Sequence, residues 1–301
     1  MTTIVQSYRT SGCAVASPVR RRAAASMRSV ERRVLESVGR AMGQFAMLRP
    51  DDRIAVGVSG GKDSLCLLHA LVAYRRRAPF PYELTAVTIE QGKFKAPIRT
   101  IEAAVRALGV PWVLRDDRQT LRLVADGIAH GCDVCSRHRR GALYRVADEI
   151  GATVLALGHT ADDCAESLLR NILFNGRIAS LPPVARSRKG SLRLIRPLVF
   201  VSEALTAAYA DARGFTAVKC VCGDQDGPRR ELRRFLTDLE ARRPGVAASI
   251  AAALGNVNAY TLFDPALLDV EHGRRSGCAT PTIGQEYRSP RGAGRPLGGR
   301  A

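Results

Sequence analysis

One short stretch, in which an apolar segment runs into two glycines and a lysine, constrains this chain more than any other. Arg53–Val58 (RIAVGV) is rich in β-branched residues and predicts a buried strand. The segment breaks at Ser59–Ser64 (SGGKDS), and Leu65–Tyr74 then has the composition of a buried helix. A glycine turn between a strand and a helix exposes backbone N–H groups at the positive end of the helix dipole. The stretch therefore predicts a binding site for phosphate.

Each position of the turn suits that role. Gly60 and Gly61 allow a positive φ and a close approach to an anion, Lys62 brings a positive charge, and Ser59 and Ser64 bring hydroxyl donors. The spacing differs from the common nucleotide loop, which needs G-x-x-x-x-G-K-[ST]. Ser-Gly-Gly-Lys-Asp-Ser instead resembles the signature of the PP-loop ATP pyrophosphatases, which cleave ATP at the α-phosphate and release pyrophosphate.

The rest of the chain alternates between strands and helices. This alternation predicts an α/β fold, with a parallel sheet and helices on both faces. Further strands are predicted at Tyr82–Glu90, Pro111–Leu114, Ala152–Leu157 and Leu192–Pro197. Predicted helices are Ser29–Leu48, Pro97–Leu108, Thr120–Ala129, Arg139–Ile150, Asp162–Asn175, Ser202–Arg213, Arg229–Arg242 and Val246–Leu254.

Polar residues follow two of these strands directly. Gly158, His159, Asp162 and Asp163 come after Ala152–Leu157, so we expect them in the crevice beyond the carboxyl ends of the strands, beside ATP. Thr88–Gln91, at the end of the second strand, is expected to line the crevice too, with Thr88 beside the adenosine.

Carboxylates near ATP usually serve Mg²⁺, which prefers oxygen ligands. Asp63 in the loop and Asp163 are the candidates for this ion. Asp162 could instead be the N-cap of the helix that follows it.

Charge and composition limit the class of protein and its partners. The formal net charge is +18 and 46% of residues are hydrophobic, which indicates a globular chain with an anionic polymer such as nucleic acid as its partner. No apolar run is long enough to span a membrane and no secretory signal stands at the N-terminus, so a cytoplasmic location is expected. We expect residues 1–28 to be a flexible basic arm, 29–225 the ATP-binding domain, 226–272 a helical segment and 273–301 a disordered tail.

The eight cysteines divide into three groups. Cys66 and Cys164 lie in helical patterns and are expected in the core, and Cys13 and Cys278 lie near the ends. The remaining four form C-x-x-C at Cys132 and Cys135, and C-x-C at Cys220 and Cys222. These two pairs, expected at loop corners, are compatible with a four-cysteine zinc site, a three-thiolate iron–sulfur cluster with one open iron, or a C-x-x-C redox pair.

With these parts assembled, the chain resembles the TtcA family of bacterial tRNA 2-thiocytidine synthetases, which are PP-loop tRNA thiolases. The resemblance runs from about Arg32 to Pro265. It is carried by the stretches DRIAVGVSGGKDS (52–64), CDVCSRHRRGALYRVADEIG (132–151), ALGHTADDCAESLLRNILFNGRIASLPP (156–183), IRPL (195–198) and CGDQ (222–225).

The resemblance implies a [4Fe–4S] cluster held by Cys132, Cys135 and Cys222, and the catalytic roles fall on these cysteines with Lys62 and Asp63. The usual C-x-x-C-G-[ST]-Q of the family is here Cys220-Val-Cys222-Gly-Asp-Gln, one residue shorter. The implied reaction adenylates the C2 oxygen of cytidine 32 in the tRNA anticodon loop and replaces that oxygen with sulfur. A cysteine desulfurase is the implied sulfur donor, and a homodimer is compatible with the family.

Other functions remain open from the residues. A related tRNA thiolase could act on uridine, and a lysidine synthetase shares the ATP loop but needs no set of cysteines. A zinc-stabilised RNA-binding protein with a vestigial ATP loop is the alternative from outside the enzymes.

Overall fold

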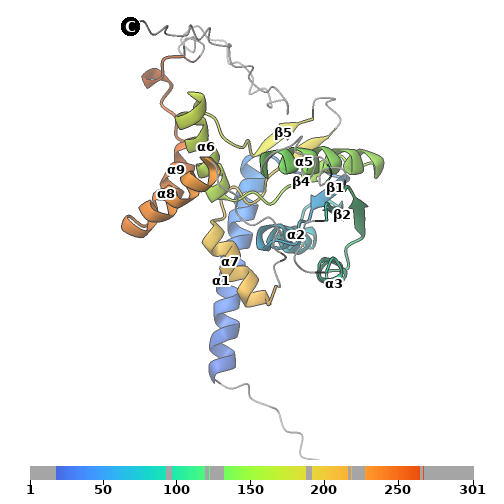
Figure 1. Ribbon diagram of the computed structural model, residues 1–301. Helices are drawn as coiled ribbons and strands as arrows, with labels where there is room; N and C mark the ends of the chain where they lie inside the picture. The colour runs from blue at the N-terminus through green and yellow to red at the C-terminus, as the bar shows by residue number, and fades with distance from the viewer. Residues whose placement is uncertain are drawn as a thin grey trace, which may run out of the picture.

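In the computed structural model, a six-stranded sheet forms the centre of the protein (Figure 1). The structure describes residues 18–92, 97–118, 122, 132–187, 192–215, 218, 228–264 and 267. The order of the strands is β3-β2-β1-β4-β6-β5, and every neighbouring pair is parallel except β5 and β6. The strands are β1 (Asp52–Gly57), β2 (Tyr82–Glu90), β3 (Trp112–Asp116), β4 (Val154–Ala156), β5 (Val184–Arg186) and β6 (Arg193–Ile195).

The order of the strands reverses between β1 and β4. The chain builds outward from β1 through β2 to β3, then returns to the other side of β1 and continues through β4 to β6. A crevice opens at such a reversal, beyond the carboxyl ends of the strands. The turns after β1 and β4, which carry most of the predicted site, lie beside each other there.

Helices cover both faces of the sheet, as the alternating pattern predicted. They are α1 (Pro18–Gln44), α2 (Lys62–Arg75), α3 (Arg99–Arg106), α5 (Cys132–Glu149), α6 (Ala161–Asn175), α7 (Glu203–Arg213), α8 (Pro228–Arg242), α9 (Val246–Ala253) and the 3-10 turn η1 (Ala259–Thr261). Figure 1 shows α2 and α3 on one face of the sheet and α5 on the other.

The alternation of side chains along β1 explains the two hydrophobic cores. Ile54 and Val56 point to the face covered by α1, α2 and α3, and Ala55 points to the face covered by α5. Because β1 is buried on both faces, its sequence is almost continuously apolar. Its neighbours β2 and β4 contribute to both cores in the same way.

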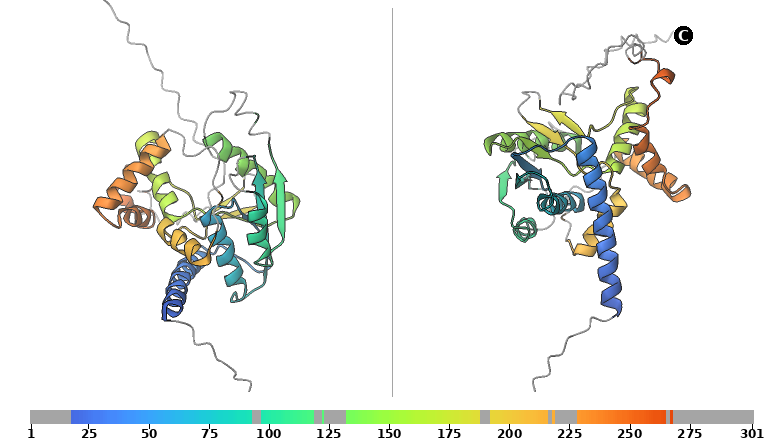
Figure 2. Two further views of the ribbon diagram at one scale, coloured as in Figure 1. Left: turned by 60° about the horizontal axis from the view of Figure 1, so that its bottom comes forward. Right: turned by 180° about the vertical axis from the view of Figure 1, so that it is seen from behind.

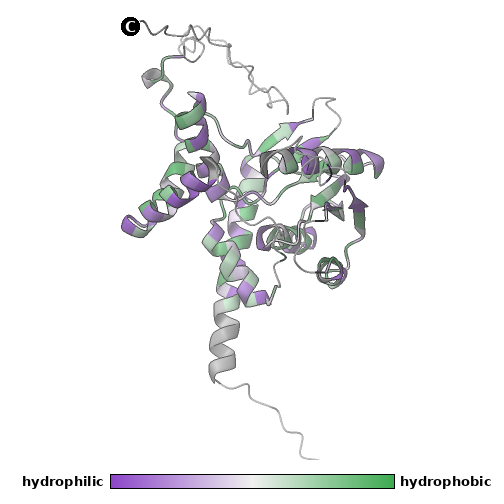
Figure 3. Cartoon of the chain, viewed as in Figure 1, coloured by the Kyte–Doolittle hydropathy of each residue, from purple (hydrophilic) through white to green (hydrophobic). Residues whose placement is uncertain are grey.

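A second helical group stands beside the sheet. Helices α8 and α9 pack against α6 and against each other (Figures 1 and 2). Figure 3 shows that many residues of α8 are hydrophilic. Large apolar side chains are exposed in the last turns of α6 and just after it, namely Ile172, Leu173 and Phe174 in the helix and Ile178 beyond it.

Several predicted bounds need correction. Helix α1 begins at Pro18 and not at Ser29, so the end of the segment predicted to be a flexible arm is helical. Proline suits the first turn of a helix, and the alanines and arginines that follow are good helix formers. The short strand β5 was not predicted; it is an edge strand held by pairing with β6.

Two further differences concern helices near the site. Helix α5 already begins at Cys132, so the first cysteine pair lies in the first turn of a helix and not at a loop corner. An apolar helix face is expected to be buried, but Ile172 and Leu173 of α6 are exposed. The predicted helix Thr120–Ala129 lies almost entirely outside the described residues. Among those that are described, no helix is long and apolar enough to cross a membrane.

Candidate active site

The loop after β1 wraps around the start of α2. Gly60 has a φ of +77°, and a Cβ at this position would lie 2.8 Å from Cδ1 of Ile101, so only glycine fits. Ser64 closes the loop: its hydroxyl donates to the Gly61 carbonyl at 2.8 Å and accepts from the Ser59 N–H at 3.2 Å. No side chain caps the N-terminus of α2. The first amides of the helix can therefore bind an anion, as the sequence predicted.

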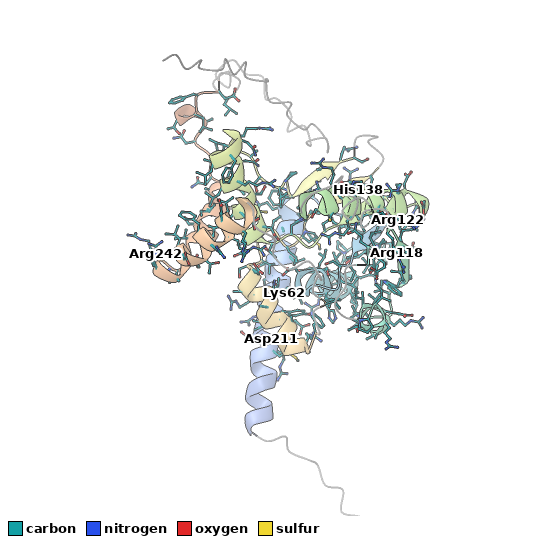
Figure 4. All side chains as sticks on the ribbon, in the orientation of Figure 1. Lys62, Arg118, Arg122, His138, Asp211 and Arg242 are labelled. Atoms are coloured by element: carbon teal, nitrogen blue, oxygen red, sulfur yellow. The ribbon has the colours of Figure 1, made fainter. Side chains whose placement is uncertain are left out.

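Side chains in the first turn of α7 hold both charged residues of the loop, and Figure 4 shows Lys62 beside this helix. Lys62 Nζ donates to Glu203 Oε1 at 2.8 Å and to Asp63 Oδ2 at 3.2 Å. The Thr206 hydroxyl donates to Asp63 Oδ1. Burial opposes the charge on Lys62, but its bond to Glu203 and the two nearby carboxylates outweigh this effect and raise its pKa. The ammonium group is thus kept charged where phosphates would bind.

The turn after β4 packs directly on the phosphate loop. A Cβ at Gly158 would lie 3.1 Å from the backbone carbonyl carbon and oxygen of Asp63, so the two turns are in backbone contact. His159 is half-buried next to it, and its Nδ1 accepts a hydrogen bond of 3.2 Å from Nε of Arg196. Arg196 follows β6 and is 5% exposed. The order of the strands thus brings together the start of α2, the turn after β4 and the residue that follows β6.

Two carboxylates in the first turn of α6 have different roles. Thr160 is the N-cap: it accepts from the Asp163 N–H, and Asp163 Oδ2 accepts from the Thr160 N–H at 2.9 Å, which completes a capping box. Asp162 is therefore not the N-cap. Its Oδ2 accepts from the Glu203 N–H at 2.6 Å and so holds the start of α7. Burial of this carboxyl raises the pKa of Asp162.

A cavity of about 340 Å³ lies above these turns. Ser59, Gly61, Asp63 and Ser64 line one side of it, and Gly158, His159 and Asp163 line another. Helices α5 and α6 complete the wall with Ser136, Arg139, Arg140, Leu143, Glu166, Ser167 and Arg170. The phosphate loop, the predicted polar turn and three arginines thus surround one space.

Of the stretch expected at the end of β2, Ile89 lines this cavity and Thr88 does not. The Thr88 hydroxyl donates to the Val58 carbonyl at 2.9 Å and accepts from Trp112 Nε1 at 3.0 Å, and the residue is fully buried. Neighbouring residues of a strand point to opposite faces, so Val87 and Ile89 reach the cavity and Thr88 does not.

The described cysteines differ in their burial. Cys66 and Cys164 are buried, and burial raises the pKa of the two thiols to about 12 and about 11, so both are core residues as expected. Cys132 is the first residue of α5, and Cys135, half-buried, precedes Ser136 of the cavity wall. Cys220 and Cys222 lie outside the described residues.

Val218, which precedes Cys220 by two residues in the sequence, contacts the phosphate loop. The Val218 N–H donates to the Gly60 carbonyl at 2.9 Å, and the side chain of Val218 packs where a Cβ of Gly60 would lie. No sequence pattern singled out Val218, Glu203 or Thr206 as site residues. Arg196 had one signal, since it lies in the I-R-P-L stretch that carries part of the family resemblance.

The carboxylates and thiols around the cavity can be compared with the ligands that Mg²⁺ or an iron–sulfur cluster needs. Among the described residues, no group of three or more His, Cys, Asp or Glu side chains is placed to hold a metal ion. Asp63 and Asp163 both line the cavity, which suits Mg²⁺ bound largely by phosphate oxygens and water. The C-x-x-C spacing of Cys132 and Cys135 at the start of α5 is that of two cysteines of a metal or cluster site completed by a third thiolate.

An open α/β sheet with Ser-Gly-Gly-Lys-Asp-Ser after its first strand defines the class of PP-loop ATP-binding proteins. The PP-loop domain family matches residues 30–238 of the chain. The fold is also similar to that of the U34-tRNA thiolase NcsA from Methanococcus maripaludis with its [4Fe–4S] cluster. That structure has a TM-score of 0.61 and 24% sequence identity, and the match covers 78% of this chain and 79% of that one.

Relatives at higher identity narrow the class to one family. A tRNA-cytidine(32) 2-sulfurtransferase of Anaeromyxobacter dehalogenans (strain 2CP-C) is 43% identical over 240 residues, which cover 78% of this chain and 82% of the relative. Another, of Xanthomonas axonopodis pv. citri (strain 306), is 38% identical over 268 residues, with 87% and 88% covered. The chain belongs to the family of tRNA-cytidine(32) 2-sulfurtransferases.

Proposed function

We propose that this protein is an ATP-dependent tRNA sulfurtransferase that replaces the C2 oxygen of cytidine 32 with sulfur. The observation that carries the proposal is that the phosphate loop and the helix bearing Cys132 and Cys135 border one cavity. Ser59 and Gly61 line it from the loop, and Ser136 and Arg139 line it from α5. The family of the chain supports the same reaction.

The ATP half of the reaction uses the loop and α7. The amides at the start of α2 and the Lys62 ammonium bind the phosphates, with Asp63 and Asp163 as ligands of Mg²⁺ on the cavity wall. The C2 oxygen of the base attacks the α-phosphorus, the bond to the bridging oxygen breaks, and pyrophosphate leaves. Donors placed before the reaction stabilise the charge that develops on these phosphates.

The sulfur half replaces the activated oxygen. Sulfide-level sulfur adds to C2, the bond from C2 to the adenylated oxygen breaks, and AMP leaves with that oxygen. A [4Fe–4S] cluster with one iron not bound by protein supplies a site for this sulfur. Cys132, Cys135 and Cys222 are the proposed protein ligands.

The sequence around Val218 supports the choice of the second cysteine pair. The Val218 N–H donates to the Gly60 carbonyl of the phosphate loop, and Cys220 and Cys222 follow Val218 by two and four residues in the sequence. The second cysteine pair is therefore close along the chain to a residue that contacts the ATP loop.

The tRNA is the partner that matches the charge of the protein. The net charge is +18, and Arg139, Arg140 and Arg170 line the cavity from α5 and α6. Arginines at the mouth of the site can bind phosphates on either side of the target nucleotide without reading its base.

Three further features belong to the proposal. A cysteine desulfurase supplies the sulfur as a persulfide, which a thiol reductant brings to the sulfide level with two electrons, and the protein works in the cytoplasm, where it meets tRNA and ATP. It acts as a homodimer, for which the exposed apolar side chains of α6 offer a surface. Sedimentation at micromolar concentration shows whether the wild-type protein is a dimer. If it is, Leu173→Glu should sediment as a monomer, and a Leu173→Glu variant that still sediments as a dimer would exclude this surface.

Mass spectrometry of nucleosides from a deletion strain tests the reaction. We expect loss of 2-thiocytidine and its return with the wild-type gene, but not with Lys62→Ala. Loss of a 2-thiouridine instead would assign the protein to uridine, and no change in any thionucleoside would refute thiolation.

Metal analysis of anaerobically purified protein tests the cluster. We expect about four irons and four sulfides per chain, which is the stoichiometry of a [4Fe–4S] cluster. Cys135→Ser and Cys222→Ser should lose them, whereas the matched control Cys13→Ser should keep them. A colourless protein with one bound zinc would contradict the cluster, and loss of iron from Cys220→Ser but not Cys222→Ser would move the third ligand.

A further inference from the structure

The hydroxyl of Thr206 is hydrogen-bonded to a carboxylate of the phosphate loop, although α7 and the loop are far apart in the sequence. Thr206 Oγ1 donates to Asp63 Oδ1 and also lies 2.9 Å from the Glu203 carbonyl oxygen of its own helix. A threonine hydroxyl has a single proton, and an ionised carboxylate is a stronger acceptor than a carbonyl. The proton is therefore directed mainly to Asp63.

The packing of α7 fixes the position of this hydroxyl. Thr206 is fully buried. Ser202 caps the helix by accepting from the Leu205 N–H at 3.2 Å, and the Glu203 N–H donates to Asp162 Oδ2 at 2.6 Å. The start of α7 is thus held by its own cap and by the turn after β4. A buried β-branched side chain on such a helix has little freedom to rotate, so its hydroxyl is a rigid donor.

The carboxylate of Asp63 receives one hydrogen bond on each oxygen. Oδ1 accepts from Thr206, and Oδ2 accepts from Lys62 Nζ at 3.2 Å. A carboxylate has about four lone-pair sites, so these two bonds leave lone pairs for a cation. The Asp63 side chain is 29% exposed and lines the cavity, where such a cation would meet the phosphates.

The two donors to Asp63 behave differently when a nucleotide binds. Lys62 also binds Glu203, at 2.8 Å, and it is the residue proposed to bind the phosphates. Phosphate oxygens therefore compete with Asp63 for the protons of Lys62. Thr206 does not line the cavity and has no contact with it that a phosphate could replace. Its bond is thus the one that still orients Asp63 when ATP is bound.

We propose that Thr206 is a positioning residue that orients the Asp63 carboxylate as a ligand of the Mg²⁺ that accompanies ATP. Mg²⁺ demands short bonds to oxygen in a nearly octahedral arrangement, so a carboxylate that can rotate binds it less well. Hydrogen-bond partners of metal ligands commonly contribute about 10- to 100-fold to metal affinity. The inference rests on the proposed function in one respect, namely that Asp63 is a Mg²⁺ ligand.

Calorimetric titration with a non-hydrolysable ATP analogue, in Mg²⁺ and in a chelator, tests the proposal. Thr206→Val and Thr206→Ala both remove the hydroxyl, whereas Thr206→Ser keeps it. In Mg²⁺ the first two should bind the analogue roughly tenfold or more weakly than wild type, and Thr206→Ser should bind it like wild type. In the chelator all four proteins should have the same affinity.

Three results of this titration would overturn the proposal. The first is an unchanged affinity of Thr206→Val in Mg²⁺. The second is an equal weakening in both buffers, which would mean that Thr206 only supports the fold of the site. The third is a wild-type affinity that does not depend on Mg²⁺ at all.

Thr153→Val is the matched control for the loss of a bond between a threonine and an aspartate. The Thr153 hydroxyl donates to Asp52 Oδ1 at 2.9 Å, where β1 and β4 begin, at the edge of the sheet opposite the cavity. We expect a lower Tm in both Thr153→Val and Thr206→Val, but a loss of Mg²⁺-dependent affinity only in Thr206→Val. The same loss of affinity in Thr153→Val would show that lower stability is the cause and would refute the positioning role.

A double variant tests whether Thr206 acts through Asp63. In an Asp63→Asn background, adding Thr206→Val should cause little further loss of affinity in Mg²⁺, because the two residues form one interaction. A full further loss would show that Thr206 acts elsewhere. Failure of the proposed function is distinguishable, because these titrations contain no tRNA. A protein that binds Mg²⁺ and the analogue as expected but does not thiolate tRNA would refute the function and leave this inference standing.

Discussion

Gly158→Ala is the substitution whose effect can be worked out most directly from the structure. Gly158 stands after β4, and the added Cβ would lie 3.1 Å from the carbonyl carbon and oxygen of Asp63 and 3.2 Å from the Cα of Ser64. All three distances are shorter than the roughly 3.5 Å at which carbon atoms make ordinary contact. The neighbours are backbone atoms at the start of α2 and cannot rotate away. The two turns must therefore separate by a few tenths of an ångström.

This separation should affect both stability and ATP binding. Overpacking of this kind costs about 1–3 kcal/mol of unfolding free energy, and each kcal/mol lowers Tm by about 2–4 °C in a chain of this size. A misplacement of about 1 Å can cost 10²-fold in a site, so a shift of a few tenths should weaken ATP binding several-fold to about tenfold. The backbone of Gly158 is not in the left-handed region, so the effect comes from contact and not from φ.

Thermal unfolding and calorimetric titration with a non-hydrolysable ATP analogue measure the two effects. The matched control is Gly43→Ala in α1, where an added Cβ would meet no atom within 4 Å. Because Ala is favoured over Gly in helices, its Tm should stay unchanged or rise slightly. A Gly158→Ala variant with the Tm and ATP affinity of wild type would refute the reasoning that the two turns are in rigid contact.

Three other outcomes are expected. Glu203→Gln should tighten ATP binding by up to about fivefold in the same titration. Glu203 competes with phosphate for Lys62 through a half-exposed ion pair, and such a pair is worth up to about 1 kcal/mol. Weaker ATP binding would contradict this competition. Thr160→Ala should lower the unfolding free energy by about 0.5–2 kcal/mol in urea titrations, since it removes the N-cap of α6; no loss would contradict the cap. Folding raises the pKa of Asp162. The protonated carboxyl therefore stabilises the folded state, fully at a pH below the pKa of the unfolded chain, and this stabilisation is lost as the pH rises through the pKa of the folded protein. Asp162→Asn keeps an acceptor for the Glu203 N–H, so its stability relative to wild type should improve as pH rises from 4 to 7; a constant difference would show that Asp162 does not titrate with folding.

The sequence by itself determined the features that depend on neighbours along the chain. The loop of Ser59–Ser64 followed from a β-branched strand, two glycines and an apolar helix, and the structure confirms it. The helix predicted over Ser202–Arg213 is observed as α7, with Ser202 as its N-cap and Gly214 after its last turn. The alternation of strands and helices was enough to predict a parallel sheet with ligands at its carboxyl edge.

Tertiary structure decided which polar side chains meet at that edge. The stretch Thr88–Gln91 was expected in the site from its place at a strand end, but the alternation of side chains along β2 puts Ile89 and its neighbour Val87 there and not Thr88. Asp162 could have been the N-cap of its own helix, yet its carboxylate accepts from the Glu203 N–H at the start of α7, because β4 and β6 are neighbours in the sheet. The bond between Arg196 and His159 depends on the same pairing. Local patterns report contacts within a turn or a strand, whereas these bonds join segments that only the order of the strands brings together.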